Sequence, residues 1–291
     1  MSVKILTDLI KLRITIASTM TAALGYTMAR GRIDFNIIPI LVGGLLLASA
    51  SAALNQIQEV DIDLKVNRTA NRPIPSGRIT KSTAIFVSIT LFVIGLLILV
   101  LFYDWRVAAL GVSAAILYNG IYTPLKRITP FAVVPGALIG AIPPLVGWVA
   151  AEGHLIDPRI YYLCFFFFIW QIPHFWLLLL FYSDQYKDNE LPSLFDRFSE
   201  NKVKQITFIG IVATAITGIL LPSYILLQPQ AIGFIISMSG IILMIRAFSL
   251  LKKKKANLKI IDVKKSYRKR FIEINIYALF VTLLVIVTNI V

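Results

Sequence analysis

The sequence predicts an all-α integral membrane protein: a polytopic bundle of about nine transmembrane helices that forms one domain over residues 1–291, with a cytoplasmic N-terminus. Three observations predict this class. Of the 291 residues, 57% are hydrophobic and only 15% are charged, and the mean hydropathy is +0.79. Apolar runs of about 20 residues, the length that crosses roughly 30 Å of hydrocarbon, recur along the whole chain. The basic residues gather on alternate loops.

Nine apolar runs are long enough to be spans. They cover residues 14–30, 36–56, 82–102, 105–123, 131–151, 159–182, 203–225, 229–249 and 271–291. Only Tyr103 and Asp104 separate the third run from the fourth, which predicts a tight helical hairpin. An arrangement of eight spans is the alternative. The first run lacks a small-residue cleavage site and the N-terminus lacks an organelle leader, so we expect a retained first helix and a multi-pass protein of a prokaryotic cell (cytoplasmic) membrane.

The basic residues behind the net charge of +14 are distributed unevenly between the two sides of the membrane. With nine spans, 25 of the 29 Lys and Arg residues fall on the side that holds the N-terminus. The positive-inside rule then places the N-terminus in the cytoplasm and the C-terminus outside, and this distribution argues against nucleic acid as a partner. The densest basic segment, residues 246–270, is interpreted as a topology anchor against anionic lipid heads. The single cysteine, Cys164, excludes an intrachain disulfide and a thiolate metal cluster.

Eight of the fifteen acidic residues form two clusters at span ends on the predicted cytoplasmic side. In the first cluster, after the second span, Asn55, Glu59 and Asp63 stand at positions i, i+4 and i+8. If the span continues as a helix, these three side chains line one face and Asp61 points away from it. Because an ionised group near hydrocarbon is costly unless it has a partner or a task, this face is a candidate site.

The second cluster follows the sixth span and contains Asp184 and Asp188, again at i and i+4. Two such helix ends predict the two halves of an internally repeated bundle. Like charges at this spacing repel each other, and Mg²⁺ relieves the repulsion because it prefers oxygen ligands and bridges carboxylates to substrate phosphates. A solvated helix end paired with Lys65 and Arg68 is the structural alternative for the first cluster.

The loop after the first cluster, residues 67–78, carries three arginines and contains two prolines and a glycine. The planar guanidinium group is well suited to holding a pair of phosphate oxygens. Carboxylates for a metal, followed by arginines for phosphate at a membrane surface, predict a site that holds a diphosphate while the rest of the molecule stays in lipid.

The acidic face and the arginine-bearing loop described above, together with three later segments, resemble the UbiA-type intramembrane prenyltransferases. Residues 55–63 and 67–73 together look like the first Asp-rich motif of that family, with Glu59 at the position where Asp is common. Three further segments resemble the branch of the family whose acceptor is heme b, and they are residues 122–127, 140–148 and 170–176. The resemblance covers roughly residues 10–195.

This resemblance implies an enzyme that transfers the farnesyl group of farnesyl diphosphate to a vinyl group of heme b through an allylic carbocation, with Mg²⁺ assisting departure of the diphosphate. It implies catalytic metal ligands at Asn55, Glu59, Asp63, Asp184 and Asp188. It implies substrate contacts from Arg68, Asn71, Arg72, Tyr122, Lys126 and Arg127. The segment Lys11-Leu12-Arg13 lacks the proline that commonly precedes its arginine, which leaves the role of Arg13 open.

His174 is one of only two histidines and lies beside Pro173 inside the sixth span. Proline frees a backbone carbonyl one turn earlier and often kinks the helix, which makes room for a flat macrocycle. Two interpretations of His174 stay open. It binds the heme substrate, as an iron ligand or a proton carrier, or it is a buried imidazole hydrogen-bonded to a neighbouring helix.

Two other functions also stay open. Within the same chemistry, the acceptor is a quinone precursor or a lipid; in a different class, the chain is a cation transporter that uses intramembrane carboxylates. Transporter carboxylates usually lie near the bilayer midplane, whereas these clusters lie at span ends. The expected partners are farnesyl diphosphate, heme b, the lipid bilayer and a downstream heme-modifying enzyme or terminal oxidase assembly.

Overall fold

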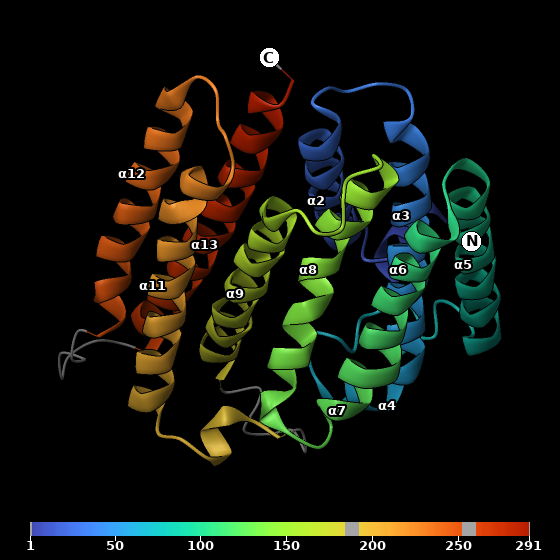
Figure 1. The fold of residues 1–291 in the computed structure, drawn as a ribbon. Coiled ribbons are helices and arrows are strands. Elements are labelled where there is room, and N and C mark those ends of the chain that lie inside the picture. Colours follow the sequence, from blue (N-terminus) through green and yellow to red (C-terminus); the bar gives the residue numbers. More distant parts are fainter. Residues whose placement is uncertain (1, 184–191, 252–259, 291) are drawn as a thin grey trace. The chain divides into compact units, whose positions relative to one another are not determined.

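The structure is a computed structural model that describes residues 2–183, 192–251 and 260–290. These residues form helices joined by turns and loops, with no β-strand among them (Figure 1). They divide into two compact units. Unit 1 comprises residues 1–127 and 142–156, and unit 2 comprises residues 128–141 and 157–291.

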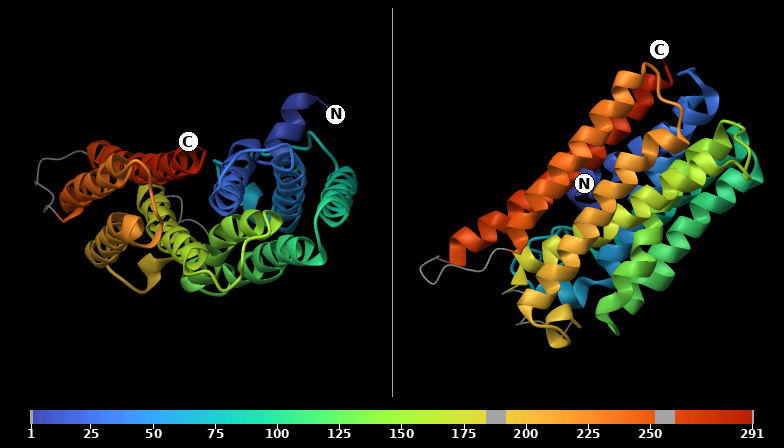
Figure 2. Two further views of the ribbon diagram at one scale, coloured as in Figure 1. Left: turned by 45° about the horizontal axis from the view of Figure 1, so that its top comes forward. Right: turned by 60° about the vertical axis from the view of Figure 1, so that its left-hand side comes forward.

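Unit 1 is built around α3. Its helices are α1 (Val3–Leu9), α2 (Leu12–Arg30), α3 (Ile37–Gln58), α4 (Val60–Lys65), α5 (Lys81–Phe102), α6 (Trp105–Ala115), a π-helix (Ile116–Tyr122), α7 (Thr123–Leu125) and the second half of α8 (Val133–Ala150). Helix α3 packs against α2, α5 and α6 (Figure 2). Helices α2 and α8 cross at backbone contact, because a Cβ atom on Gly25 would lie 1.8 Å from the carbonyl oxygen of Pro144.

The predicted hairpin between the third and fourth spans is present. Asp104 caps the N-terminus of α6 by accepting hydrogen bonds from the backbone N–H groups of Arg106 (2.8 Å) and Val107 (3.3 Å). The hydroxyl of Tyr103 accepts a hydrogen bond from Ile40 N (3.1 Å). The hairpin is therefore tied to the first turn of α3.

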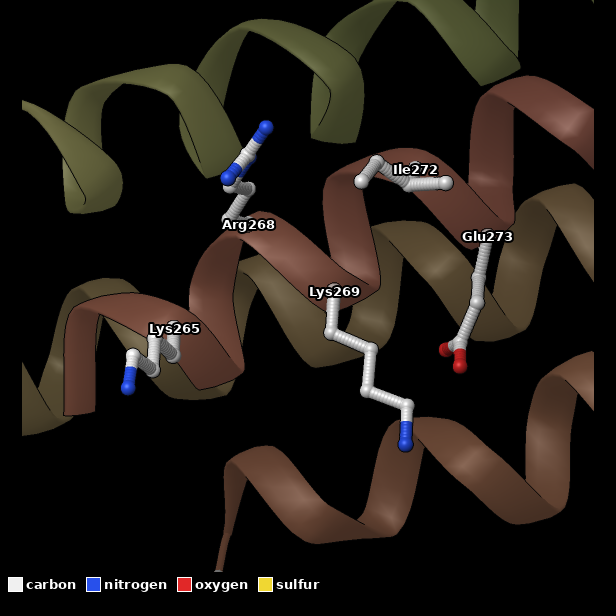
Figure 3. Close-up of a pocket in the computed structure, with 5 residues that line it drawn as sticks. All are labelled: Lys265, Arg268, Lys269, Ile272 and Glu273. Carbon is white, nitrogen blue, oxygen red and sulfur yellow. The ribbon is translucent and has the colours of Figure 1, made fainter. Parts of the chain in front are cut away.

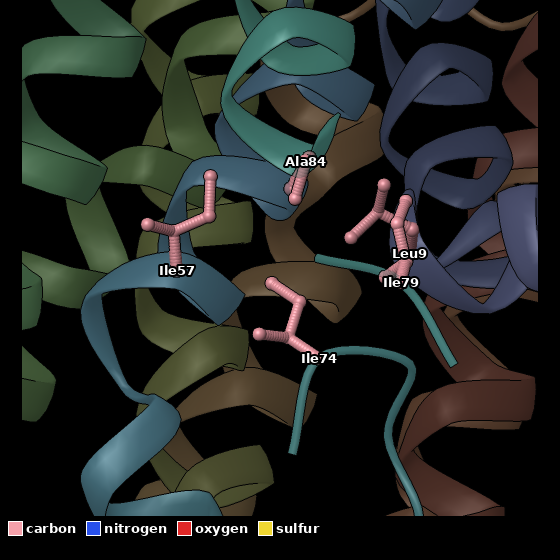
Figure 4. Close-up of a cluster of buried hydrophobic side chains, with 6 residues drawn as sticks. Leu9, Ile57, Ile74, Ile79 and Ala84 are labelled. Atoms are coloured by element: carbon pink, nitrogen blue, oxygen red, sulfur yellow. The ribbon is translucent and has the colours of Figure 1, made fainter. Parts of the chain in front are cut away.

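A small hydrophobic cluster holds the arginine-bearing loop between α4 and α5. Ile74 and Ile79 of the loop are buried together with side chains from three helices, which are Leu9 of α1, Ala53 and Ile57 of α3 and Ala84 of α5 (Figure 4). Burying a large aliphatic side chain contributes about 1.5–3 kcal/mol. The loop is thus anchored by its isoleucines, and its arginines serve other contacts.

Unit 2 is built around α9. Its elements are the first half of α8, α9 (Pro158–Phe181), α11 (Glu200–Tyr224), α12 (Gln230–Ala247), α13 (Ile260–Thr288) and three short 3₁₀ turns, Pro130–Ala132, Leu194–Asp196 and Phe248–Leu250. Helix α9 packs against α11 and α13, and α12 also contacts α11 and α13 (Figures 1 and 2).

Eight helical segments in the described residues are long and apolar enough to cross a membrane, which confirms the polytopic all-α class. They are Ile37–Gln58, Lys81–Phe102, Trp105–Leu125, Pro130–Ala150, Pro158–Phe181, Glu200–Tyr224, Gln230–Leu250 and Val263–Thr288. Each coincides with an expected span, and the last begins eight residues before the predicted residue 271. The remaining expected span, residues 14–30, coincides with helix α2, which is not among the eight. Length and composition alone are therefore compatible with eight spans as well as with nine.

Candidate active site

The first acidic cluster lies where α3 ends and α4 begins. Glu59 departs from helical geometry, with φ −107° and ψ 8°. Backbone hydrogen bonds from Glu59 N to Asn55 O (3.1 Å) and from Asp63 N to Glu59 O (2.8 Å) nevertheless carry the helical register across the junction. Asn55, Glu59 and Asp63 are only 2%, 4% and 3% exposed, whereas Asp61 is exposed. The structure thus places Asn55, Glu59 and Asp63 on one buried face and Asp61 away from it, as their spacing predicts.

Two cations neutralise the buried carboxylates. Arg72 NH1 donates to both carboxylate oxygens of Asp63, at 2.7 and 2.6 Å, and lies 3.9 Å from Glu59 Oε2. Lys126 Nζ pairs with Glu59 Oε1, and the same oxygen accepts a hydrogen bond from Asn55 Nδ2 (2.7 Å). A buried carboxylate requires such partners because it has lost its hydration. Both cations come from segments that the sequence predicts to bind phosphate.

A third cation enters the site through an unusual turn between α1 and α2. Lys11 has φ 51° and ψ 48°, the left-handed conformation that residues other than glycine seldom adopt. The buried amide of Gln56 holds this turn by donating to the carbonyl oxygens of Asp8 (2.8 Å) and Leu9 (2.9 Å) at the end of α1. Carbonyls at a helix end have no partner within their own helix. Gln56 therefore supplies the contact that lets the chain reverse at Lys11.

The turn directs the Lys11 ammonium group into the acidic cluster. Lys11 Nζ donates to Asn55 Oδ1 (2.7 Å) and lies 3.4 Å from the hydroxyl of Tyr118. Burial, together with the nearby Arg72 guanidinium, lowers the pKa of Lys11 to about 7. In the sequence, Lys11 is only one of several basic residues before the first span, so sequence reasoning missed its place in the site. Arg13, whose role the sequence left open, is exposed.

The π-helix Ile116–Tyr122 completes the wall of the site in unit 1. Thr123 Oγ1, directly after it, accepts a hydrogen bond from Asn55 Nδ2 (3.1 Å) and donates to Tyr118 O (2.8 Å). Asn119 donates to Gln58 Oε1 (3.2 Å) and accepts a bond from Gln58 Nε2 through its backbone carbonyl (3.0 Å). Segments of π-helix occur frequently at functional sites. No residue pattern in the sequence indicates this one.

Several residues expected to bind the substrate lie outside the buried cluster. Arg127 donates to both oxygens of Asp61 at 2.9 Å, and this guanidinium lowers the pKa of the Asp61 carboxyl. Arg68 and Asn71 are exposed on the loop after α4. Tyr122 is close to the cluster, since its ring lies 5.8 Å from Lys126 Nζ and stacks on Tyr118 at 5.9 Å.

Comparison with known proteins decides the family, because the UbiA prenyltransferase family profile matches residues 18–267. The chain belongs to the UbiA prenyltransferase family. Protoheme IX farnesyltransferase from Nitratidesulfovibrio vulgaris is 31% identical over 87% of this chain and 88% of its own length. The protein of the same name from Christiangramia forsetii is 35% identical over 86% of this chain and 84% of its own. This UbiA family member is therefore an enzyme, a prenyltransferase, and the cation-transporter interpretation is wrong.

Solved structures show the same UbiA fold. A digeranylgeranylglyceryl phosphate synthase has a TM-score of 0.77 at 19% identity and covers 99% of this chain and 98% of its own. A UbiA homologue from Archaeoglobus fulgidus, bound to GPP and Mg²⁺, has a TM-score of 0.71 at 13% identity and covers 96% of this chain and 99% of its own. At these identities the likeness concerns the fold.

The donor atoms of the first cluster fit Mg²⁺. Asn55, Glu59 and Asp63 offer only hard oxygen ligands, and Mg²⁺ commonly takes one or two carboxylates together with substrate phosphates. In the part of the chain that the structure describes, no three His, Cys, Asp or Glu side chains gather in a group that could hold a metal ion. The remaining predicted ligands of this UbiA enzyme, Asp184 and Asp188, lie outside the described residues.

His174 lies in unit 2, on the face of α9 that contacts α13. Its Nδ1 is 2.9 Å from Asn275 Oδ1, and the amide of Asn275 donates to Phe271 O (2.5 Å). Because that amide points its N–H toward Phe271, its oxygen accepts from His174, which places the imidazole proton on Nδ1. Rings of Trp170 and Phe271 lie 5.0 and 4.9 Å from the imidazole. The predicted hydrogen bond to a neighbouring helix is therefore present, and it leaves Nε2 as an acceptor.

Proposed function

We propose that this UbiA enzyme transfers the farnesyl group of farnesyl diphosphate to a vinyl group of heme b in the cell membrane. The diphosphate leaves, the vinyl group bonds to the allylic carbon, and water captures the resulting cation with loss of a proton, giving a hydroxyethylfarnesyl heme. The observation that carries the proposal is the buried face of Asn55, Glu59 and Asp63, matched with Lys11, Arg72 and Lys126. The names of the relatives support farnesyl and heme as the two substrates. The Mg²⁺ and GPP bound by the Archaeoglobus fulgidus homologue support a metal-dependent diphosphate site.

Asn55, Glu59 and Asp63 would hold Mg²⁺, with Asp184 and Asp188 as the further ligands expected from sequence. When bound, Mg²⁺ supplies Lewis-acid charge that makes the diphosphate a better leaving group. The carboxylates are suited to this role because they are buried and already lie on one helix face. Asn55 would offer Oδ1, the atom that now accepts the hydrogen bond from Lys11.

The three cations of the cluster would bind the diphosphate oxygens. Arg72 and Lys126 now pair with Asp63 and Glu59, and both would be available for phosphate if these carboxylates held a metal. Lys11 stands beside Asn55 and adds a third donor from a different helix pair. Donors held in place before the reaction stabilise the charge that develops on the leaving group, at no cost in reorganisation. Arg68, Asn71 and Arg127 would meet the substrate from the exposed rim.

The acceptor site is proposed from unit 2. His174 has the tautomer that leaves Nε2 available for heme iron or a proton, and Trp170 and Phe271 provide flat aromatic surfaces next to it. Asn275 fixes the imidazole orientation, as outer partners of metal-binding histidines commonly do. A free Nε2 acceptor beside aromatic surfaces supports a heme-side role, and the hydrogen bond to Asn275 serves that role as well as a structural one.

Mass spectrometry of hemes tests the proposal. Cells that express the protein are extracted and their heme pool is compared with that of cells expressing the Asp63→Asn variant. We expect a farnesylated heme in the first extract only. An unmodified heme pool together with a farnesylated quinone precursor or lipid would move the assignment to another acceptor.

A further inference from the structure

Basic side chains line a hollow of about 450 Å³ near the N-terminal end of α13. Its walls are Lys265, Arg268, Lys269, Ile272 and Glu273 (Figure 3). The carboxylate of Glu273 lies 2.7 Å from both Arg246 and Arg270, so its charge is already satisfied. Arg268 is exposed and points to the opposite side of α13 from Lys269 and Glu273 (Figure 3). Glu273 therefore does not neutralise the guanidinium group of Arg268, which lies at the other side of the helix.

Arg268 lies on the face of α13 that contacts His174. Phe271 and Asn275 make that contact, and Arg268 precedes them by three and seven residues, the spacing that places side chains on one helix face. A rise of 1.5 Å per residue puts Arg268 about 10 Å from Asn275 along the axis, toward the basic end of the helix. The guanidinium and the imidazole therefore lie along one stripe.

We propose that Arg268 binds a propionate carboxylate of the heme acceptor, an inference that rests on the proposed function. Heme b is a flat macrocycle with two carboxylates on one edge. If its plane lies against Trp170 and Phe271 beside His174, its ionised edge must leave the hydrocarbon region, because an unpaired charge there is costly. Arg268 is the guanidinium on the same stripe, and a guanidinium holds a carboxylate through two parallel hydrogen bonds.

The test measures heme binding in place of turnover. The full-length protein is placed in nanodiscs of phosphatidylcholine, and ferric heme b is titrated while the Soret band is followed. We compare wild type, Arg268→Gln and the matched control Lys269→Gln, which makes the same charge change on the neighbouring residue. Heme dimethyl ester, whose carboxylates are blocked, is titrated into the same proteins.

A lost charge-assisted hydrogen bond corresponds to a Kd increase of about 10- to 100-fold. We expect that increase for Arg268→Gln with heme and for wild type with the ester, while Arg268→Gln binds both ligands equally and Lys269→Gln behaves as wild type. Equal wild-type affinity for heme and its ester would overturn the proposal, and so would an equal loss in Lys269→Gln. The ester experiment needs no variant, so misfolding of Arg268→Gln does not prevent a decision. Failure of wild type to bind heme at all would refute the proposed acceptor itself.

Discussion

Replacing Asp63 with asparagine separates the predicted catalytic role of this carboxylate from its structural one. Asp63 accepts hydrogen bonds at 2.7 and 2.6 Å from one Arg72 nitrogen. The amide of the Asp63→Asn variant would keep the shape of the side chain but lose the charge of that pairing. Charge-assisted bonds contribute about 1.5–3 kcal/mol. Because the Arg72 side chain is 22% exposed and stays 3.9 Å from Glu59, we expect the lower end, a loss of about 1.5 kcal/mol in the free energy of unfolding.

The loss of activity should be far larger. Removing one group that stabilises developing charge typically lowers kcat by about 10²–10³, and Asp63 is one of only two carboxylates in the described cluster. Transfer of radiolabelled farnesyl from its diphosphate to heme b, measured in membranes, reports activity, and thermal unfolding in detergent reports stability. Asp61→Asn is the matched control, since Asp61 is two residues away, is exposed and pairs with Arg127. We expect its activity to stay within about threefold of wild type, because exposed ion pairs contribute little.

Two results would refute this reasoning. If Asp63→Asn kept more than about a tenth of wild-type activity, the loss would be far smaller than that expected for a charge-stabilising group. That result would refute the assignment of Asp63 to the metal site. Equal losses in Asp61→Asn and Asp63→Asn would show that the face of the helix does not distinguish the two residues.

Four further predictions concern other parts of the molecule. Chelator should abolish transfer and added Mg²⁺ should restore it; activity that survives chelation would contradict the metal assignment. Lys11→Ala should raise KM for farnesyl diphosphate about tenfold, the effect of one charge-assisted bond, whereas the exposed Lys4→Ala should not, and a change in kcat alone would argue against phosphate binding. Asn275→Leu should weaken heme binding and shift the Soret band while diphosphate affinity is unchanged, since Asn275 contacts His174 and Phe271, on the proposed acceptor side. Asp104→Ala should lower the free energy of unfolding by about 1 kcal/mol through loss of a helix cap. Arg106 lowers the pKa of Asp104 in the folded protein, so the stability that the ionised cap contributes is present above the ordinary pKa of Asp and is lost as pH falls through the lower folded pKa. Denaturation curves of the variant and wild type should therefore converge in acid.

The spans and the first acidic face were predictable because each depends on a local rule. Hydrophobic length predicts a helix such as α5 to within one residue, and spacing at i, i+4 and i+8 places Asn55, Glu59 and Asp63 together whatever surrounds them. The start of the last span was predicted eight residues late, since the first turns of α13 are charged and hydropathy detects only the part in lipid.

The rest of the site depends on contacts between distant segments. Lys11 reaches Asn55 only because Gln56 holds a left-handed turn that lies far earlier in the chain. Tyr118 and Thr123 enter the site through a π-helix whose sequence looks like any apolar span. Arg127 was expected at the phosphate, but Asp61 is its partner across 66 residues. Each of these placements is a consequence of packing, which residue spacing does not report.

The balance of charge in unit 1 supports a metal that arrives together with an anion. Lys11, Arg72 and Lys126 surround the buried carboxylates of Glu59 and Asp63, so the unit 1 part of the site, without the expected ligands Asp184 and Asp188, has more cations than anions. A divalent cation that bound alone would compete with Arg72 and Lys126 for the two carboxylates and leave these partly buried cations without anionic partners, which is unfavourable. If the carboxylates held a metal, the oxygens of a diphosphate bound with it would be the new partners of Arg72 and Lys126. Arg72 and Lys126 would then each keep an anionic partner, as binding of a metal together with a diphosphate allows.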